Sequence, residues 1–160
     1  MKTTRLISIL LIAVLLCAFL TACGEKTATT VIDFEKTMSD KGFNVNVSAP
    51  ETSPAITAVA KNEGYEIYFY EFQAAEGEES GTSTEYATRI YESIKNDFDN
   101  KENSKLMKVE LTMPTYAYYH FIASDKYYIV SRIGNTVMFA NTSDEYTEEV
   151  KALFEELGYK

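Results

Sequence analysis

The sequence predicts an α+β fold: an antiparallel sheet of about five to seven strands with two or three amphipathic helices packed on one face, in the order α-β-β-β-α-β-β-β-β-α. Three segments repeat apolar residues with a helical period, and up to seven shorter segments have the pattern of strands. Short turn signals separate consecutive strands, which favours antiparallel pairing. Helices on one face would leave the other face of the sheet open.

The predicted helices cover residues 31–41, 83–97 and 144–157. The first two begin with residues at capping-box spacing, and the first and third end at a glycine, which is a common C-terminal cap. The capping pairs are Thr30 with Asp33 and Thr82 with Glu85, and the glycines are Gly42 and Gly158. Each helix carries one apolar stripe, as expected for a helix that packs on a sheet.

The predicted strands alternate with turn signals along the rest of the chain. Gly134-Asn135 is a two-residue hairpin signal between the last two strands. The strands are expected at residues 43–48, 55–61, 65–73, 105–113, 115–123, 127–133 and 136–141. Residues 30–160 are therefore expected to form a single domain.

Two of these strands are aromatic on both sides, which allows two interpretations. A surface strand normally alternates apolar with polar residues, so a strand without this alternation is covered on both faces or displays its rings. Arg132 lies in an apolar strand and must pair with a carboxylate, reach solvent or receive an anionic ligand. The residues of the hypothetical ligand or partner face are Tyr68, Tyr70, Tyr116, Tyr118 and Arg132.

The first twenty-two residues have the pattern of a signal peptide that is removed. Lys2 and Arg5 form a positive start, and residues 6–19 are an uncharged apolar run that is short for a membrane span. The residues Leu20-Thr21-Ala22-Cys23 follow this run. They resemble the lipobox of bacterial lipoproteins: an aliphatic residue, a small or β-branched one, Gly/Ala/Ser, then Cys.

The resemblance implies that Cys23 becomes the first residue, carries a diacylglycerol on its sulfur and anchors the protein by two or more acyl chains. Residues 23–29 would then be a short tether on the outer face of the bacterial cytoplasmic membrane, or on the outer membrane in a Gram-negative cell. The rest of the chain loosely resembles small uncharacterised lipoproteins of Gram-positive bacteria in its KGF, SRIGNT and LGY motifs. No activity follows from that resemblance.

Charge limits the partners of the domain. Without Lys2 and Arg5 the chain has 13 basic and 24 acidic residues, a net charge of about −11. Nucleic acid is excluded as a partner because binding it requires basic residues that neutralise phosphates. An anionic lipid surface would also repel the domain, so attachment to the membrane is assigned to the acyl chains on Cys23.

Catalytic and metal-binding motifs are absent from the sequence. His120 is the only histidine, which excludes two-histidine zinc motifs, and no G-x-S-x-G elbow or glycine-rich phosphate loop occurs. A possible calcium loop beginning at Asp97 lacks its glycine and its closing glutamate. The sequence therefore predicts no cofactor, no metal site and no catalytic residue.

These observations favour a non-catalytic module that binds a protein, peptide or glycan near the membrane surface. The alternative is a hydrolase of cell-wall or glycan substrates that uses only carboxylates and tyrosines. That alternative requires two carboxyl groups about 5–10 Å apart in a cleft.

Overall fold

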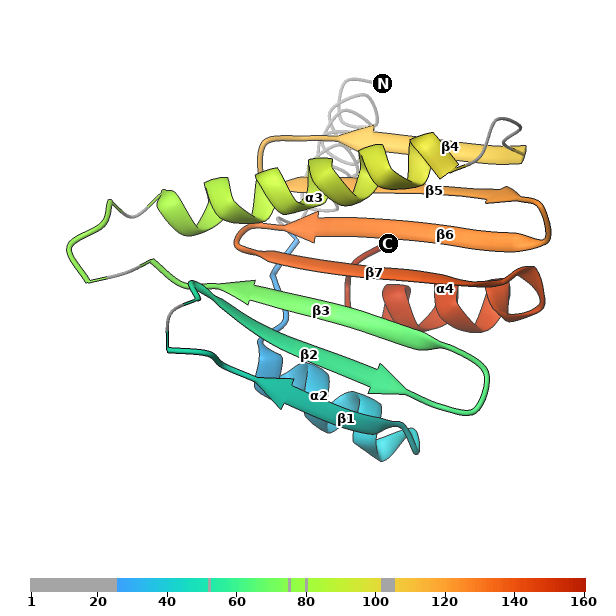
Figure 1. Ribbon diagram of the computed structural model, residues 1–160, viewed down its shortest axis with the longest axis horizontal. Coiled ribbons are helices and arrows are strands. Elements are labelled where there is room, and N and C mark those ends of the chain that lie inside the picture. The colour runs from blue at the N-terminus through green and yellow to red at the C-terminus, as the bar shows by residue number, and fades with distance from the viewer. Residues whose placement is uncertain (1–25, 52, 75, 80, 102–105) are drawn as a thin grey trace, which may run out of the picture.

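Seven antiparallel strands form one sheet in the computed structural model, which describes residues 26–51, 53–74, 76–79, 81–101 and 106–160 (Figure 1). The proposed lipobox and Cys23 lie outside the described residues. The strands are β1 (Asn44–Ser48), β2 (Ala55–Lys61), β3 (Glu66–Phe72), β4 (Leu106–Thr112), β5 (Tyr116–Ala123), β6 (Lys126–Ile133) and β7 (Thr136–Ser143). The predicted α+β class and antiparallel sheet are confirmed.

The spatial order of the strands is β1-β2-β3-β7-β6-β5-β4. Two meanders, β1 to β3 and β4 to β7, meet where β3 pairs with β7. Tight turns fix the register of the second meander. Ser124 and Asp125 have φ values of 50° and 61° between β5 and β6, and Gly134 has φ 52° between β6 and β7. Positive φ at these positions is typical of two-residue hairpin loops.

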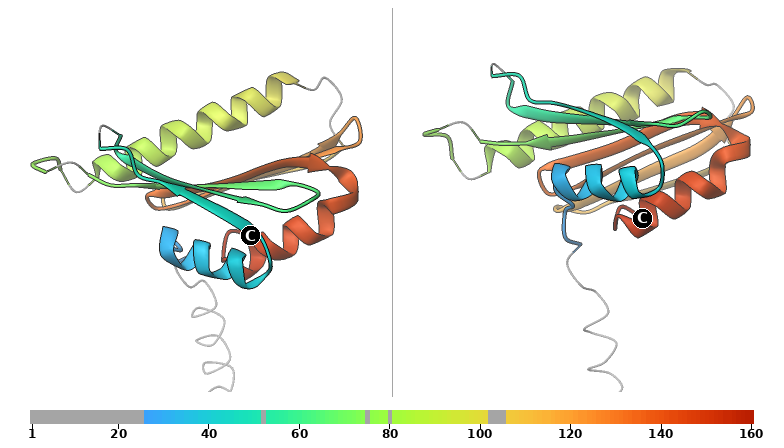
Figure 2. Two further views of the ribbon diagram at one scale, coloured as in Figure 1. Left: turned by 60° about the horizontal axis from the view of Figure 1, so that its bottom comes forward. Right: turned by 90° about the horizontal axis from the view of Figure 1, so that it is seen from below.

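The helices lie on both faces of the sheet, so the prediction that they share one face is wrong. Helices α2 (Val31–Asp40) and α4 (Thr147–Glu156) cover one face, and α3 (Thr82–Lys101) crosses the other (Figure 2). The physical reason is the sequence of the central strands, which carry large apolar side chains on both sides and therefore need two covers. The short 3-10 helix η1 (Asp144–Tyr146) precedes α4 and also departs from the expected order.

The core beneath α2 and α4 is built around stacked rings and alanines. Phe34 of α2 lies parallel to Phe69 of β3, with ring centroids 4.8 Å apart, and both side chains are fully buried. Ala58 and Ala60 of β2 face the same core. Their small side chains leave room for α2, and burying each phenylalanine contributes roughly 1.5–3 kcal/mol.

The core beneath α3 is a second, separate cluster. Tyr91 and Phe98 of α3 pack on Tyr119, Phe121 and other buried residues of the central strands. Helix α3 contacts β6, β3 and β7. The corresponding side chains of β2, including Thr57 and Val59, remain only half-buried. This face of the sheet is therefore covered along its centre and open toward β2 and β1.

None of the helices among the described residues is both long enough and apolar enough to cross a membrane.

Candidate binding groove

A row of aromatic rings lies on the face of the sheet that α3 crosses, just beside the helix. Tyr68 of β3 pairs directly with Phe139 of β7, and their rings are parallel at 4.7 Å. The ring of Tyr70 is parallel to those of Phe139 and Phe72, with centroids 5.9 and 6.2 Å away. The row therefore runs along β3 with one ring contributed by β7.

Two open cavities follow this row along α3. The larger has a volume of about 740 Å³ and lies between the C-terminal half of α3 and the rings of Tyr68 and Phe139. The smaller, about 440 Å³, lies between the N-terminal half of α3 and the rings of Tyr70 and Phe72. We call the two cavities and their shared aromatic row the aromatic groove. Helix α3 forms one wall, and the half-buried side chains of β2 border the other side.

The polar groups of the aromatic groove lie around its larger cavity. The hydroxyl of Tyr68 donates a hydrogen bond of 2.5 Å to Oε2 of Glu66, and Lys61 pairs with Oε1 at 2.8 Å. Lys101 pairs with Asp97 at 2.6 Å on α3. The groove therefore combines apolar ring surface with charged and hydroxyl groups, a composition typical of ligand sites with a few orienting polar groups.

Electrostatics at Glu66 favour binding over acid catalysis. The hydrogen bond from Lys61, followed by that from Tyr68, lowers the pKa of the Glu66 carboxyl. The same contact with Glu66 raises the pKa of the Tyr68 hydroxyl. A glycosidase general acid needs the opposite shift, because it must hold its proton near neutral pH. Glu66 and Asp97 do line one cavity, but both carboxylates are paired with lysines.

The structure divides the five residues of the predicted ligand face between the two sides of the sheet. Tyr68 and Tyr70 lie in the aromatic groove. Tyr116 and Tyr118 point to the opposite face and are buried, with exposed fractions of 6% and 5%. Arg132 is on the α3 side but is also buried. The five side chains therefore do not form one surface.

Arg132 is bound by backbone carbonyls. Its guanidinium donates to the carbonyl oxygens of Met113, Pro114 and Gly134 at 3.2, 2.9 and 3.3 Å. A carboxylate partner, one of the three alternatives that the sequence left open for Arg132, is not among its contacts in the described part of the chain. Burial lowers the pKa of the Arg132 guanidinium, and the more distant Tyr91 and Glu92 oppose that shift. Arg132 thus joins two neighbouring turns and leaves no exposed cation for a ligand.

His120 lies in the opposite core with two tyrosine rings. Tyr118 and Tyr127 are 5.1 and 5.7 Å from it between ring centroids. Nδ1 of His120 is buried and has no hydrogen-bond partner among the described residues, and the buried hydroxyls of Tyr118 and Tyr127 interact with each other. Burial, and then the charges of Lys151 and Lys160, lower the pKa of His120 to about 4. The imidazole is therefore neutral at pH 7.

Phe139 and the α3 wall of the groove were missed by the sequence analysis. Phe139 was assigned only to a hairpin strand, because nothing local indicates that β7 pairs with β3. The apolar stripe of α3 was identified, but no sequence motif marks the neighbouring Asp97 and Lys101 as residues of a site. A pairing signal between residues 67–71 and 136–140 would have placed Phe139 beside Tyr68.

Comparison with protein-family models found no match, and comparison with curated proteins and with solved structures found none either. The function therefore has to be argued from the groove and the sequence.

Proposed function

We propose that this chain is a lipid-anchored extracytoplasmic protein that binds a peptide or glycan in the aromatic groove. The observation that carries the proposal is the row of parallel rings beside α3, in which Tyr68, Tyr70 and Phe139 are only half-buried, with cavities of about 740 and 440 Å³ along it. Aromatic side chains supply large apolar area in a binding site, and tyrosine adds a hydroxyl that can orient a ligand. The lipobox Leu20-Thr21-Ala22-Cys23 supports the anchor.

Binding by the groove is tested with glycan and peptide arrays, followed by calorimetry on the ligands retained. Tyr68→Ala and Tyr70→Ala should each weaken binding about tenfold or more, since truncating an aromatic anchor typically costs more than about 1–2 kcal/mol. Ile32→Ser is the control, because Ile32 is 72% exposed on the other side of the molecule. Equal affinity in the Tyr68 and Tyr70 variants would refute the groove as the binding site.

The lipid anchor has a separate test. Replacing Cys23 with Ser should abolish labelling by a palmitate analogue and make processing insensitive to globomycin. The wild-type protein should be labelled and should accumulate as a precursor with the drug. An unlabelled wild-type protein that stays on the membrane would contradict lipidation and leave the groove proposal intact.

The hydrolase alternative rests on Glu66 and Asp97, which line the same cavity. If it holds, Glu66→Gln and Asp97→Asn should each abolish the release of sugars from cell-wall material, with binding retained. The binding module predicts no release by the wild-type protein.

A further inference from the structure

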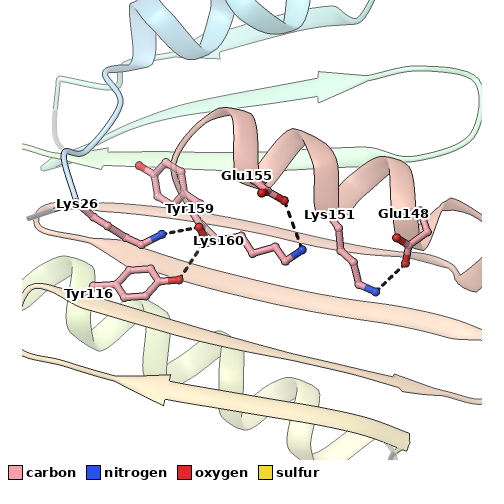
Figure 3. Close-up of polar contacts among 7 residues, drawn as sticks. All are labelled: Lys26, Tyr116, Glu148, Lys151, Glu155, Tyr159 and Lys160. Atoms are coloured by element: carbon pink, nitrogen blue, oxygen red, sulfur yellow. Dashed lines mark hydrogen bonds and ion pairs between the residues drawn. The ribbon is translucent and has the colours of Figure 1, made fainter. Parts of the chain in front are cut away.

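The chain segment next to the proposed anchor is fastened to the body of the domain. Nζ of Lys26 donates to the backbone oxygen of Lys160 at 2.5 Å (Figure 3). It also donates to the backbone oxygen of Gly158 at 3.1 Å. The same ammonium lies 4.5 Å from the centroid of the Tyr116 ring. A cation held by two carbonyl oxygens and an aromatic face is well fixed.

The residues that follow Lys26 are attached as well. The backbone of Thr29 hydrogen-bonds to the hydroxyl of Tyr159, and the N–H of Val31 donates to Glu71 at 2.7 Å. Tyr159 is fully buried and bonds in turn to Thr136. Most of the expected tether, residues 23–29, is therefore part of the folded domain. Only Gly24 and Glu25 separate Lys26 from Cys23, a distance of at most about 11 Å across three residues.

Large apolar side chains are exposed on the side of the sheet that carries α2 and α4. Among the described residues, four of the six exposed large hydrophobic side chains lie on this side, on α2 and on the two edge strands β1 and β4. Two of them, Val109 and Leu111 on β4, pair with His120 and Tyr118 and therefore face that side. The four residues and their exposed fractions are Ile32 (72%), Val47 (39%), Val109 (46%) and Leu111 (41%).

Three of the acidic side chains on the same side are paired with lysines. Glu148 pairs with Lys151 at 2.8 Å and Glu155 with Lys160 at 3.6 Å (Figure 3). A third pair joins Glu156 of α4 to Lys41 at 2.8 Å. These pairs reduce the local repulsion that the net charge of the chain would otherwise cause at an anionic membrane.

We infer that the side of the domain formed by α2, α4 and the apolar face of β4 lies against the phospholipid bilayer, with Lys26 fixing this orientation. The inference rests on the proposed lipid anchor at Cys23. Helix α3 lies on the opposite side of the sheet (Figure 2), and the aromatic groove lies beside it. In this orientation both face away from the membrane. Exposed apolar side chains at this surface would enter the interfacial region of the lipid.

The orientation is tested with the full-length lipidated protein in phosphatidylglycerol and phosphatidylethanolamine vesicles. Single cysteines are introduced by Ile32→Cys, by Leu111→Cys and, on the exposed surface of α3, by Asn96→Cys. Acylated Cys23 does not react, so a fluorophore labels only the introduced thiol. Lipids brominated close to the headgroup should quench the labels at 32 and 111 severalfold more than the label at 96. Equal quenching at all three sites, or stronger quenching at 96, would overturn the inference.

Lys26→Ala gives the second measurement. Without the Lys26 contacts, the free segment between Cys23 and the domain extends to the next attachment at Thr29. The difference in quenching between the labels at 32 and 111 and the label at 96 should therefore decrease. Lys26→Arg should retain most of this difference, because arginine can also donate hydrogen bonds to carbonyls. An unchanged contrast in Lys26→Ala would overturn the role of Lys26. Vesicle flotation distinguishes a failure of the lipid anchor from a failure of the proposed orientation. A protein that fails to float refutes the anchor and the orientation together, and one that floats with equal quenching refutes the orientation alone.

Discussion

The two faces of the sheet are covered in different ways. One face carries two helices of ten residues, α2 and α4, which meet the strands over a fully buried core. The other carries one helix of twenty residues, α3, which leaves the rings of Tyr68 and Tyr70 half-buried at its edge. Similar aromatic side chains thus serve as core on one face and as groove on the other. The difference comes from how much of each face the helices cover, and not from the kind of side chain on the strands.

Phe69 and Tyr70 provide the most direct test of this difference, since they are adjacent on β3 and point to opposite faces. Phe69 is fully buried against Phe34, so Phe69→Ala should lower the free energy of unfolding by about 3–5 kcal/mol. Tyr70→Ala removes a partly exposed ring and should cost about 1–2 kcal/mol. Chemical denaturation measures both.

Equal losses of stability from these two variants would contradict the assignment of the faces to core and groove. Ligand binding should show the opposite order. Tyr70→Ala should lose affinity, whereas folded Phe69→Ala should retain it.

His120 should make the α2/α4 face sensitive to acid. Its pKa falls from 6.5 to about 4 in the folded protein because the imidazole is buried, so the unfolded chain binds a proton more readily. The stability associated with the neutral imidazole is complete above about pH 6.5. It is lost as the pH falls toward 4, with a total on the order of 3 kcal/mol.

His120→Gln removes this titration and serves as the comparison. The stability of the wild-type protein relative to the variant should decrease between pH 7 and pH 4 in urea denaturation. A constant difference over that range would show that His120 does not titrate as its burial implies. Ligand binding in the groove, on the other face, should not depend on this histidine.

Arg132 should behave as a structural residue of the α3 face. Arg132→Lys loses most of the hydrogen bonds to the carbonyls of Met113, Pro114 and Gly134 and should cost about 1–3 kcal/mol of unfolding free energy. Thermal denaturation measures the loss. Ligand affinity should stay within about twofold, because the guanidinium is buried away from the groove. A large loss of ligand affinity with an unchanged free energy of unfolding would instead indicate that Arg132 binds the ligand.

Local signals predicted most of this fold, and contacts between distant segments account for what they missed. Apolar periodicity and turn residues located the elements; β2, for example, was expected at residues 55–61 and occupies Ala55–Lys61. The rings on both sides of β3 were noticed, but whether they were core or surface depended on where α3 crosses the sheet. Phe139 reaches Tyr68 only through the pairing of β3 with β7.

The attachment of Lys26 to Gly158 and Lys160 was equally hidden, because backbone carbonyls leave no sequence pattern. The sequence of a short polar tether is the same whether the segment is free or bound to the domain.

Tyr68→Phe should have the smallest effect and should separate the ring from its hydroxyl. The hydroxyl donates to Glu66, whose other oxygen already pairs with Lys61, so its removal should change stability by less than about 1 kcal/mol. The parallel stack of residue 68 on Phe139 should persist. If the groove binds mainly through its rings, Tyr68→Phe should keep most of the affinity that Tyr68→Ala loses. Equal losses from both variants would instead assign ligand recognition to the hydroxyl and Glu66.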